Sequence, residues 1–196
     1  MLPPISNSFL VVFALLLVLS ALLLAADIIV RLGPRGKLVG VSTFAQTPEV
    51  LAGIPRIGGF SKPTLQKTIS LEPDIIIATS DVHVDTFAVS PVLALNPHRL
   101  CDIEQNVHLV GAALGVSAAA NRLAIGSATE LASLRLPRAA GTRPTIFFEE
   151  WPDPLVGGIG WVGDLIERLG GLDVFSELRS KRIANERRID PIEVLA

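Results

Sequence analysis

Carboxylates and an aromatic side chain gather in one short stretch, and they are the first candidates for chemistry. Glu149 and Glu150 directly precede Trp151, and Asp153 follows between two prolines. Two carboxylates on either side of a glycosidic bond can act as general acid and base. Adjacent residues of a strand point to opposite faces, however, so Glu149 and Glu150 could not flank one bond. We therefore interpret this stretch as a binding surface and expect one of the two carboxylates to be paired or buried.

The glycines that follow have the spacing of a dinucleotide-binding loop. Gly158, Gly160 and Gly163 satisfy G-x-G-x-x-G directly before a predicted helix. In that fingerprint the first glycine stands at the end of a strand, whereas here residues 152–157 intervene. An NAD(P)-binding Rossmann-type enzyme that uses the loop from Gly158 to Gly163 is therefore an alternative to a binding protein.

Two further patterns have residue types that metal or nucleophile chemistry uses. Asp81, His83 and Asp85 alternate, so on a strand they would share one face and could hold a metal. A polar loop after a strand explains the same pattern, and we predict no metal site. Cys101 is the only cysteine, which excludes an internal disulfide, and we predict a small apolar role for it inside a helix. The chain has no G-x-S-x-G elbow, and we predict that it is not an enzyme.

Charge and composition exclude a nucleic-acid surface. The 196 residues carry a formal net charge of −2 without a basic stripe. Aromatic residues make up only 5% and tyrosine is absent, so each tryptophan or phenylalanine in a loop is informative. The length suits one large domain or two small lobes.

An apolar segment, Phe9 to Leu24, precedes the first basic residue, Arg31. It is compatible with the apolar region of a secretory signal, with a short membrane span, or, in its later half, with a buried strand of a parallel sheet. The sequence leaves these three open. A membrane-anchored interaction module without a small ligand is a further alternative for the whole protein.

Apolar runs alternate with helix signals in the first half of the chain. We predict a helix over residues 25–32, closed by Gly33, and a helix with Pro63 at its first position. Strands are predicted over residues 37–42, 75–78 and 92–95. Helix-then-strand repetition with short links predicts a parallel sheet covered by helices.

The second half begins with a long helical stretch, residues 99–136, with a break or kink at Gly115. A strand is predicted over residues 145–151 and a helix from Trp161 to the Gly170-Gly171 cap. The sequence thus predicts an α/β fold of two Rossmann-like lobes with parallel sheets. Residues 1–98 form the first lobe, a helical spine over 99–136 links them, and residues 137–196 form the second.

Several motifs, taken in order, resemble class III substrate-binding proteins of ABC importers, in particular the branch that binds cobalamin and iron chelates. The motifs are LVGVS at 38–42, GGFSKP at 58–63, LEPDIIIA at 71–78, VLALNP at 92–97, FEEW at 148–151, GIGW at 158–161 and GGLDVF at 170–175. The resemblance covers about residues 20 to 196.

The resemblance implies an exported, monomeric protein of the periplasm or cell surface that hands its ligand to an ABC permease in the membrane. It implies no cofactor, and a ligand, cobalamin or a related corrinoid or iron chelate, in the cleft between the lobes. Carried over by position, the ligand-binding residues are Phe44, Phe60, Ser80, Asp81, Glu150, Trp151, Asp153 and Trp161.

The chain also departs from the family pattern. The usual Ser-x-x-Pro-Ser-x-Thr-Glu motif is replaced by SALLLAAD at residues 20–27, and Gln66 stands where a glutamate for permease docking is usual. A second glutamate for permease docking is expected near residues 190–193, and Glu193 is the residue of this type there. Further βα units normally follow the position of Ala196, so we expect the second lobe to be incomplete.

Overall fold

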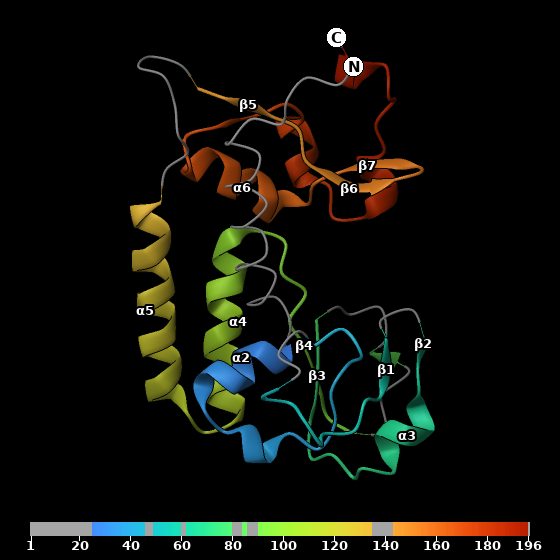
Figure 1. The fold of residues 1–196 in the computed structure, drawn as a ribbon, viewed down its shortest axis with the longest axis vertical. Helices are drawn as coiled ribbons and strands as arrows, with labels where there is room; N and C mark the ends of the chain where they lie inside the picture. Colours follow the sequence, from blue (N-terminus) through green and yellow to red (C-terminus); the bar gives the residue numbers. More distant parts are fainter. Residues whose placement is uncertain are drawn as a thin grey trace. The chain divides into compact units, whose positions relative to one another are not determined.

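A computed structural model describes residues 25–45, 49–59, 62–79, 84–85, 90–134 and 143–195 of the chain (Figure 1). The chain divides into two compact units. The N-terminal unit comprises the described residues from Ala25 to Pro97 together with Gln105–Gly126, and the C-terminal unit comprises His98–Glu104 and the described residues from Ser127 onward. Each unit is described by itself.

The N-terminal unit opens with helix α2, Ala25–Leu32. Its first turn carries Asp27 and its last turn Arg31, which suits the helix dipole at both ends. Gly33 ends it at a φ of 98°, a conformation that glycine adopts without strain. The predicted helix over residues 25–32 is confirmed, and a short 3-10 helix, Arg35–Lys37, follows it.

The described strands of this unit form two separate two-stranded sheets. β3 (Ile76–Ala78) pairs in parallel with β4 (Val92–Ala94), as the apolar runs predicted. Within the described part of the chain, the only paired residue of the strand predicted over 37–42 is Val41, in a parallel bridge to Arg56. The start of that run is instead taken by the 3-10 helix.

The prediction for Pro63 is wrong. Pro63 ends β2 (Lys62–Pro63), which pairs antiparallel with β1 (Gly58–Gly59). Helix α3, Leu65–Ile69, begins two residues later. Proline fits this place because a two-stranded ribbon leaves one side of each strand without ladder hydrogen bonds.

The helical stretch breaks at Gly115, as predicted, where φ is 71°. The break divides the stretch into α4 (Leu100–Ala113) and α5 (Ser117–Ser133), which lie side by side in Figure 1. A Cβ placed on Gly111 would lie 2.3 Å from the Cβ of Ala120, so the two helices touch with almost no side chain between them. Ile28, Leu95 and Val110 join this contact in the main core of the unit.

The C-terminal unit contains two strand pairs. β5 (Thr145–Ile146) pairs in parallel with β8 (Leu172–Asp173), while β6 (Glu149–Pro152) and β7 (Leu155–Gly157) form an antiparallel hairpin. The strand predicted over residues 145–151 is therefore two strands, and the second runs into a hairpin, with Pro152 opposite Leu155. The two prolines do not exclude pairing there, because proline is tolerated at the end of a free-edged ribbon.

Helix α6, Gly160–Arg168, confirms the helix predicted from Trp161. Leu165, Ile166 and Leu169 are buried as predicted. The helix ends at Gly170, at a φ of 91°, and the Gly171 N–H donates to the Ile166 carbonyl at 2.9 Å.

Three short 3-10 helices follow, Ser176–Ser180, Ala184–Arg187 and Glu193–Leu195. The rings of Phe147 and Phe175 pack edge to face, with their centroids 5.6 Å apart. Across the described ranges, no helix combines the length and the apolar character needed to cross a bilayer.

Candidate ligand-binding site

Phe44 lies on a turn of the N-terminal unit. The residue is 61% exposed, and hydrogen bonds hold the backbone of the turn. Thr43 N–H donates to the Gly58 carbonyl at 3.0 Å, and Phe44 N–H donates to the Ser42 hydroxyl at 3.2 Å. The Arg56 guanidinium donates to the Ser42 carbonyl at 2.9 Å. These bonds fix the backbone of the turn, so a contact made by the exposed Phe44 ring would cost little backbone entropy.

Gly59, the second residue of strand β1, allows the Phe44 ring to pack against the backbone. A Cβ on Gly59 would lie 2.7 Å from Cε2 of Phe44. The ring therefore covers the bare backbone of Gly59, and any side chain at this position would displace it. A cavity of about 260 Å³ adjoins the ring, and its walls include Ser42, Gly58 and Thr79.

Trp151 is the exposed aromatic residue of the C-terminal unit, on strand β6. It is 62% exposed, and its indole N–H donates to the Asp153 carbonyl at 3.0 Å. Because this bond already satisfies the only polar atom of the ring, the exposed faces offer apolar and stacking contact alone. The carboxylate of Asp153 is exposed beside it.

The expectation for the two neighbouring glutamates is confirmed. Glu150 is paired with Arg187, whose side chain is only 3% exposed and also donates to the Gly157 carbonyl at 2.5 Å. Glu149 is exposed. Arg187 therefore ties both strands of the hairpin to the 3-10 helix in which it lies, and it fixes the platform that carries Trp151.

Trp161 is half-buried in the first turn of α6, next to the glycine pattern. Packing explains these glycines. A Cβ on Gly160 would lie 2.7 Å from the Arg179 carbonyl, and one on Gly163 would lie 2.6 Å from a carboxylate oxygen of Asp173. The preceding strand, β7, belongs to an antiparallel hairpin and not to a parallel βαβ unit, so the context of a dinucleotide loop is missing.

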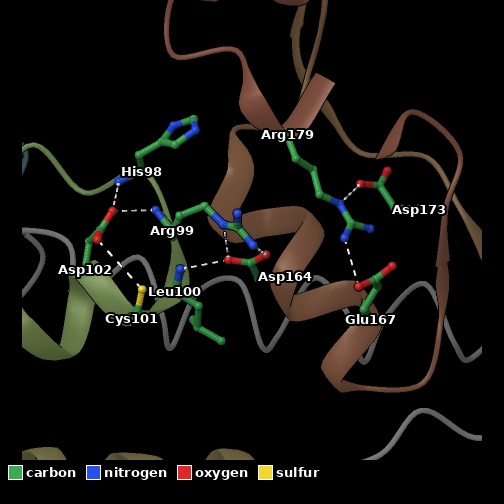
Figure 2. A network of polar contacts seen from close by, with 9 residues as sticks. All are labelled: His98, Arg99, Leu100, Cys101, Asp102, Asp164, Glu167, Asp173 and Arg179. Atoms are coloured by element: carbon green, nitrogen blue, oxygen red, sulfur yellow. Dashed lines mark hydrogen bonds and ion pairs between the residues drawn. The ribbon is translucent and has the colours of Figure 1, made fainter. Parts of the chain in front are cut away.

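A polar network joins the start of α4 to α6, and no local sequence pattern indicates it (Figure 2). Asp102 accepts hydrogen bonds from the N–H groups of His98 and Arg99 at 2.9 and 2.7 Å, which closes the first turn of α4. Asp164 accepts from the Arg99 side chain at 2.8 Å and from the Leu100 N–H at 3.0 Å. Burial acts to raise the pKa of Asp164, but these hydrogen bonds outweigh it and lower the pKa below its ordinary value.

Arg179 forms the second centre of this network. It lies between two carboxylates, with Glu167 and Asp173 each at 2.9 Å (Figure 2). The hydrogen bond from Arg179 lowers the pKa of Glu167. The pairs link α6 to the segment after β8, so their evident role is to hold the C-terminal unit together.

The remaining residues singled out from the sequence are Phe60, Ser80, Asp81 and Cys101. Phe60, Ser80 and Asp81 lie outside the described residues. Cys101 is on helix α4 as predicted but is exposed, which corrects its predicted apolar role. Its sulfur lies 3.8 Å from a carboxylate oxygen of Asp102. Within the described ranges, no three His, Cys, Asp or Glu side chains come together in a way that could hold a metal.

Parallel strand pairs packed with helices define an α/β protein. The sequence matches the family described as periplasmic binding protein over residues 22–189. The chain therefore belongs to that family, and the resemblance noted above is confirmed. The family description agrees with the prediction of a binding protein and not an enzyme.

Solved structures support the fold. The chain is similar to a periplasmic heme-binding protein from Pseudomonas aeruginosa, with 21% identity and a TM-score of 0.61, over 76% of this chain and 59% of that one. It is also similar to the periplasmic vitamin B12 binding protein of Vibrio cholerae, with 18% identity and a TM-score of 0.64, over 87% and 69%. At such identities the likeness establishes the fold alone. The chain spans about three fifths of the length of the first of these proteins, and no curated protein matches it.

Proposed function

We propose that the protein is the solute-binding component of an ABC importer and that its ligand is cobalamin, a related corrinoid or an iron chelate such as heme. Support comes from membership of the periplasmic binding protein family and from similar structures whose names refer to heme and vitamin B12. The binding is reversible and non-covalent.

The observation that carries this proposal is the solvent exposure of one large aromatic side chain in each unit. Phe44 and Trp151 are each more than 60% exposed, although large apolar side chains are normally buried. The Phe44 backbone N–H donates to the Ser42 hydroxyl, and the Trp151 indole N–H donates to the Asp153 carbonyl. A flat macrocycle gains most from such surfaces, because aromatic rings give large contact area for few rotatable bonds.

Polar groups near these rings would meet the edges of the ligand. Asp153 is exposed beside Trp151 and can accept hydrogen bonds. Glu150 is already held by Arg187, so its contribution is to position the hairpin. Trp161 lies in the first turn of α6, where the helix dipole favours an anionic group. Phe60, Ser80 and Asp81 remain proposed contacts from the resemblance.

The partner and location follow from the same proposal. The protein would act outside the cytoplasm as a monomer and deliver its ligand to an ABC permease in the membrane. Light scattering of the purified protein with and without ligand tests the monomer, and a dimer in both samples would contradict it.

Fluorescence provides a direct test, because the chain has only two tryptophans. We expect cyanocobalamin or hemin to quench Trp151 saturably at micromolar concentration, and Phe44→Ala to raise the Kd without changing the unliganded spectrum. Saturable quenching by NAD, with no response to corrinoid, heme or ferric chelates, would contradict the proposal.

A further inference from the structure

The side chain of Arg56 holds both ends of the turn that carries Phe44. Its Nη1 nitrogen donates to the Ser42 carbonyl at 2.9 Å and to the Ala45 carbonyl at 3.3 Å. These carbonyls belong to the first and the last residue of a four-residue turn, which the Ala45 N–H closes by donating to the Ser42 carbonyl at 3.2 Å. Phe44 is the third residue of this turn, so it lies between the two carbonyls that Arg56 binds.

The backbone of Arg56 is itself held by its neighbours in the chain. The Val41 N–H donates to the Pro55 carbonyl, and the Ile57 N–H donates to the Val41 carbonyl, both at 3.0 Å. Arg56 therefore lies opposite Val41 in the parallel bridge between the two segments. Its half-buried side chain joins this fixed backbone to the turn that begins directly after Val41.

The partners of Arg56 separate its role from those of an ion pair and of a ligand contact. Within the described part of the chain, Arg56 donates to backbone carbonyls and forms no ion pair. Its removal would therefore leave no described carboxylate unpaired, which is the costly case for a buried charge. The adjoining cavity is lined by Phe44 and both ends of the turn, but Arg56 is not among the described residues that line it. An effect of Arg56 on a ligand at Phe44 would therefore pass through the turn.

We propose that Arg56 is a positioning residue of the ligand-binding site, which holds the turn of residues 42–45 in the conformation that exposes Phe44. The Phe44 ring packs on the backbone of Gly59, three residues after Arg56. One short segment, residues 55–59, thus supports both the backbone and the ring of Phe44. A turn that is ordered before binding loses less conformational entropy when a ligand contacts it.

The effect of Arg56 on binding rests on the proposed function, whereas its effect on the order of the turn does not. The two effects therefore need separate measurements, one without ligand and one with it. Arg35 provides a matched control for both, because it is an arginine of the same unit and donates to a backbone carbonyl, that of Ala52, at 3.2 Å.

Hydrogen exchange of the full-length chain without ligand tests the order of the turn. The Phe44 and Ala45 amides donate to acceptors inside the turn, so Arg56→Ala should raise their exchange rates about tenfold by letting the turn open. The Val41 amide should be unchanged, because its partner is a backbone carbonyl that the substitution leaves in place. Arg35→Ala should change none of the three. Equal exchange of the Phe44 and Ala45 amides in Arg56→Ala and wild type would overturn the proposal.

A double-mutant cycle tests the effect on binding, with cyanocobalamin and hemin as the probes. Arg56→Ala should raise the Kd about fivefold in the wild-type background and leave it unchanged in the Phe44→Ala background, because the arginine acts through that residue. Arg56→Lys keeps the charge and can keep one hydrogen bond to the turn, so it should retain part of the affinity. Arg35→Ala should not change the Kd.

Ligand binding and the positioning of the turn fail under different results. An equal rise in Kd in both backgrounds would mean that Arg56 acts independently of Phe44, and this would overturn the positioning role while leaving the proposed function intact. If the wild-type protein binds neither probe, the proposed function fails for these ligands, and the exchange rates of the Phe44 and Ala45 amides alone decide the role of Arg56.

Discussion

Trp151 is the residue whose replacement should most clearly separate binding from folding. The ring is 62% exposed and its indole N–H is bonded only within its own loop. Trp151→Ala should weaken ligand binding about tenfold, because an aromatic stacking contact contributes about 1 kcal/mol beyond its buried area. The melting temperature should change little.

Calorimetric titration and thermal melting measure the two effects. Trp151→Phe serves as a control that keeps an aromatic face, and it should retain most of the affinity. Ile192→Ala removes another exposed apolar side chain of the same unit and should leave binding unchanged. Equal affinity of Trp151→Ala and wild type would remove Trp151 from the site.

Arg187 is expected to matter for stability rather than for contact with the ligand. Its side chain is nearly buried, and it bonds both Glu150 and the Gly157 carbonyl. Arg187→Ala should lower the free energy of unfolding by about 3 kcal/mol, since removing one partner of a buried pair leaves the other groups unpaired.

Denaturant titration measures the loss, with exposed Arg182→Ala as the matched control. Glu150→Gln should cost less than Arg187→Ala, because Glu150 is 39% exposed and can be solvated. A loss below about 1 kcal/mol for Arg187→Ala would show that Arg187 is not the anchor of the hairpin.

Asp164 should make the stability of the protein sensitive to acid. Hydrogen bonds from Arg99 and Leu100 lower its pKa in the folded state below the ordinary value of 3.8. The ionised carboxylate is therefore favoured by folding, and its contribution is present above pH 3.8 and is lost as the pH falls through the lowered folded value. Above about pH 5 no change is expected from this group.

Unfolding by denaturant at a series of pH values checks this sign. Wild type should lose stability more steeply below about pH 4 than Asp164→Asn, which cannot titrate. Glu186→Gln, an exposed acid of the same unit, is the control and should follow wild type. Parallel curves for wild type and Asp164→Asn would contradict the assignment.

At the scale of elements, alanine substitutions at two glycines of α4 and α5 should change the stability of the protein in opposite directions. A Cβ on Gly111 would lie 2.3 Å from that of Ala120, whereas nothing lies within 4 Å of a Cβ on Gly126. Gly111→Ala should therefore destabilise by about 1 to 3 kcal/mol through overpacking. Gly126→Ala should stabilise by about 0.5 to 1 kcal/mol through helix propensity.

Thermal and denaturant unfolding of the two variants test the packing of the helices. Both substitutions add the same methyl group to a helix interior, so each is the other's control. Stabilisation by Gly111→Ala would mean that the helices are farther apart than the structure has them.

Local signals account for the elements that the sequence predicted. Capping glycines, apolar runs and periodic stripes were sufficient for α2, β3, β4 and α6 and for the break at Gly115. The other elements depend on which strands pair with each other, and a single sequence does not show this. Pro63 resembled a helix start but lies in a ribbon with β1, and residues 145–151 resembled one strand but form parts of two pairs.

For the candidate site, the sequence suggested residues but not their contacts. Phe44 and Trp151 are both exposed, and Trp151 lies on strand β6, at the end of the strand predicted over residues 145–151. The pairing of one glutamate followed from strand alternation, but its partner Arg187 is 37 residues away and no local pattern indicates it. The network around Asp164 and Arg179 likewise depends on tertiary contacts that a single sequence does not reveal.

For the whole molecule, the central claim is reversible binding of a corrinoid or iron chelate. A ligand that binds only the folded state raises its stability by mass action, by about 2.7 kcal/mol at one hundred times the Kd. The chain belongs to a family of binding proteins, and the carrying observation is the exposure of the two aromatic rings.

The most direct test is thermal melting of the full-length protein with cyanocobalamin, hemin, a ferric siderophore and NAD, each tested separately. We predict a concentration-dependent rise in Tm with one of the first three ligands and none with NAD, and a smaller rise for Trp151→Ala. A cooperative melt that none of the first three shifts, at concentrations up to the millimolar range, would contradict the account.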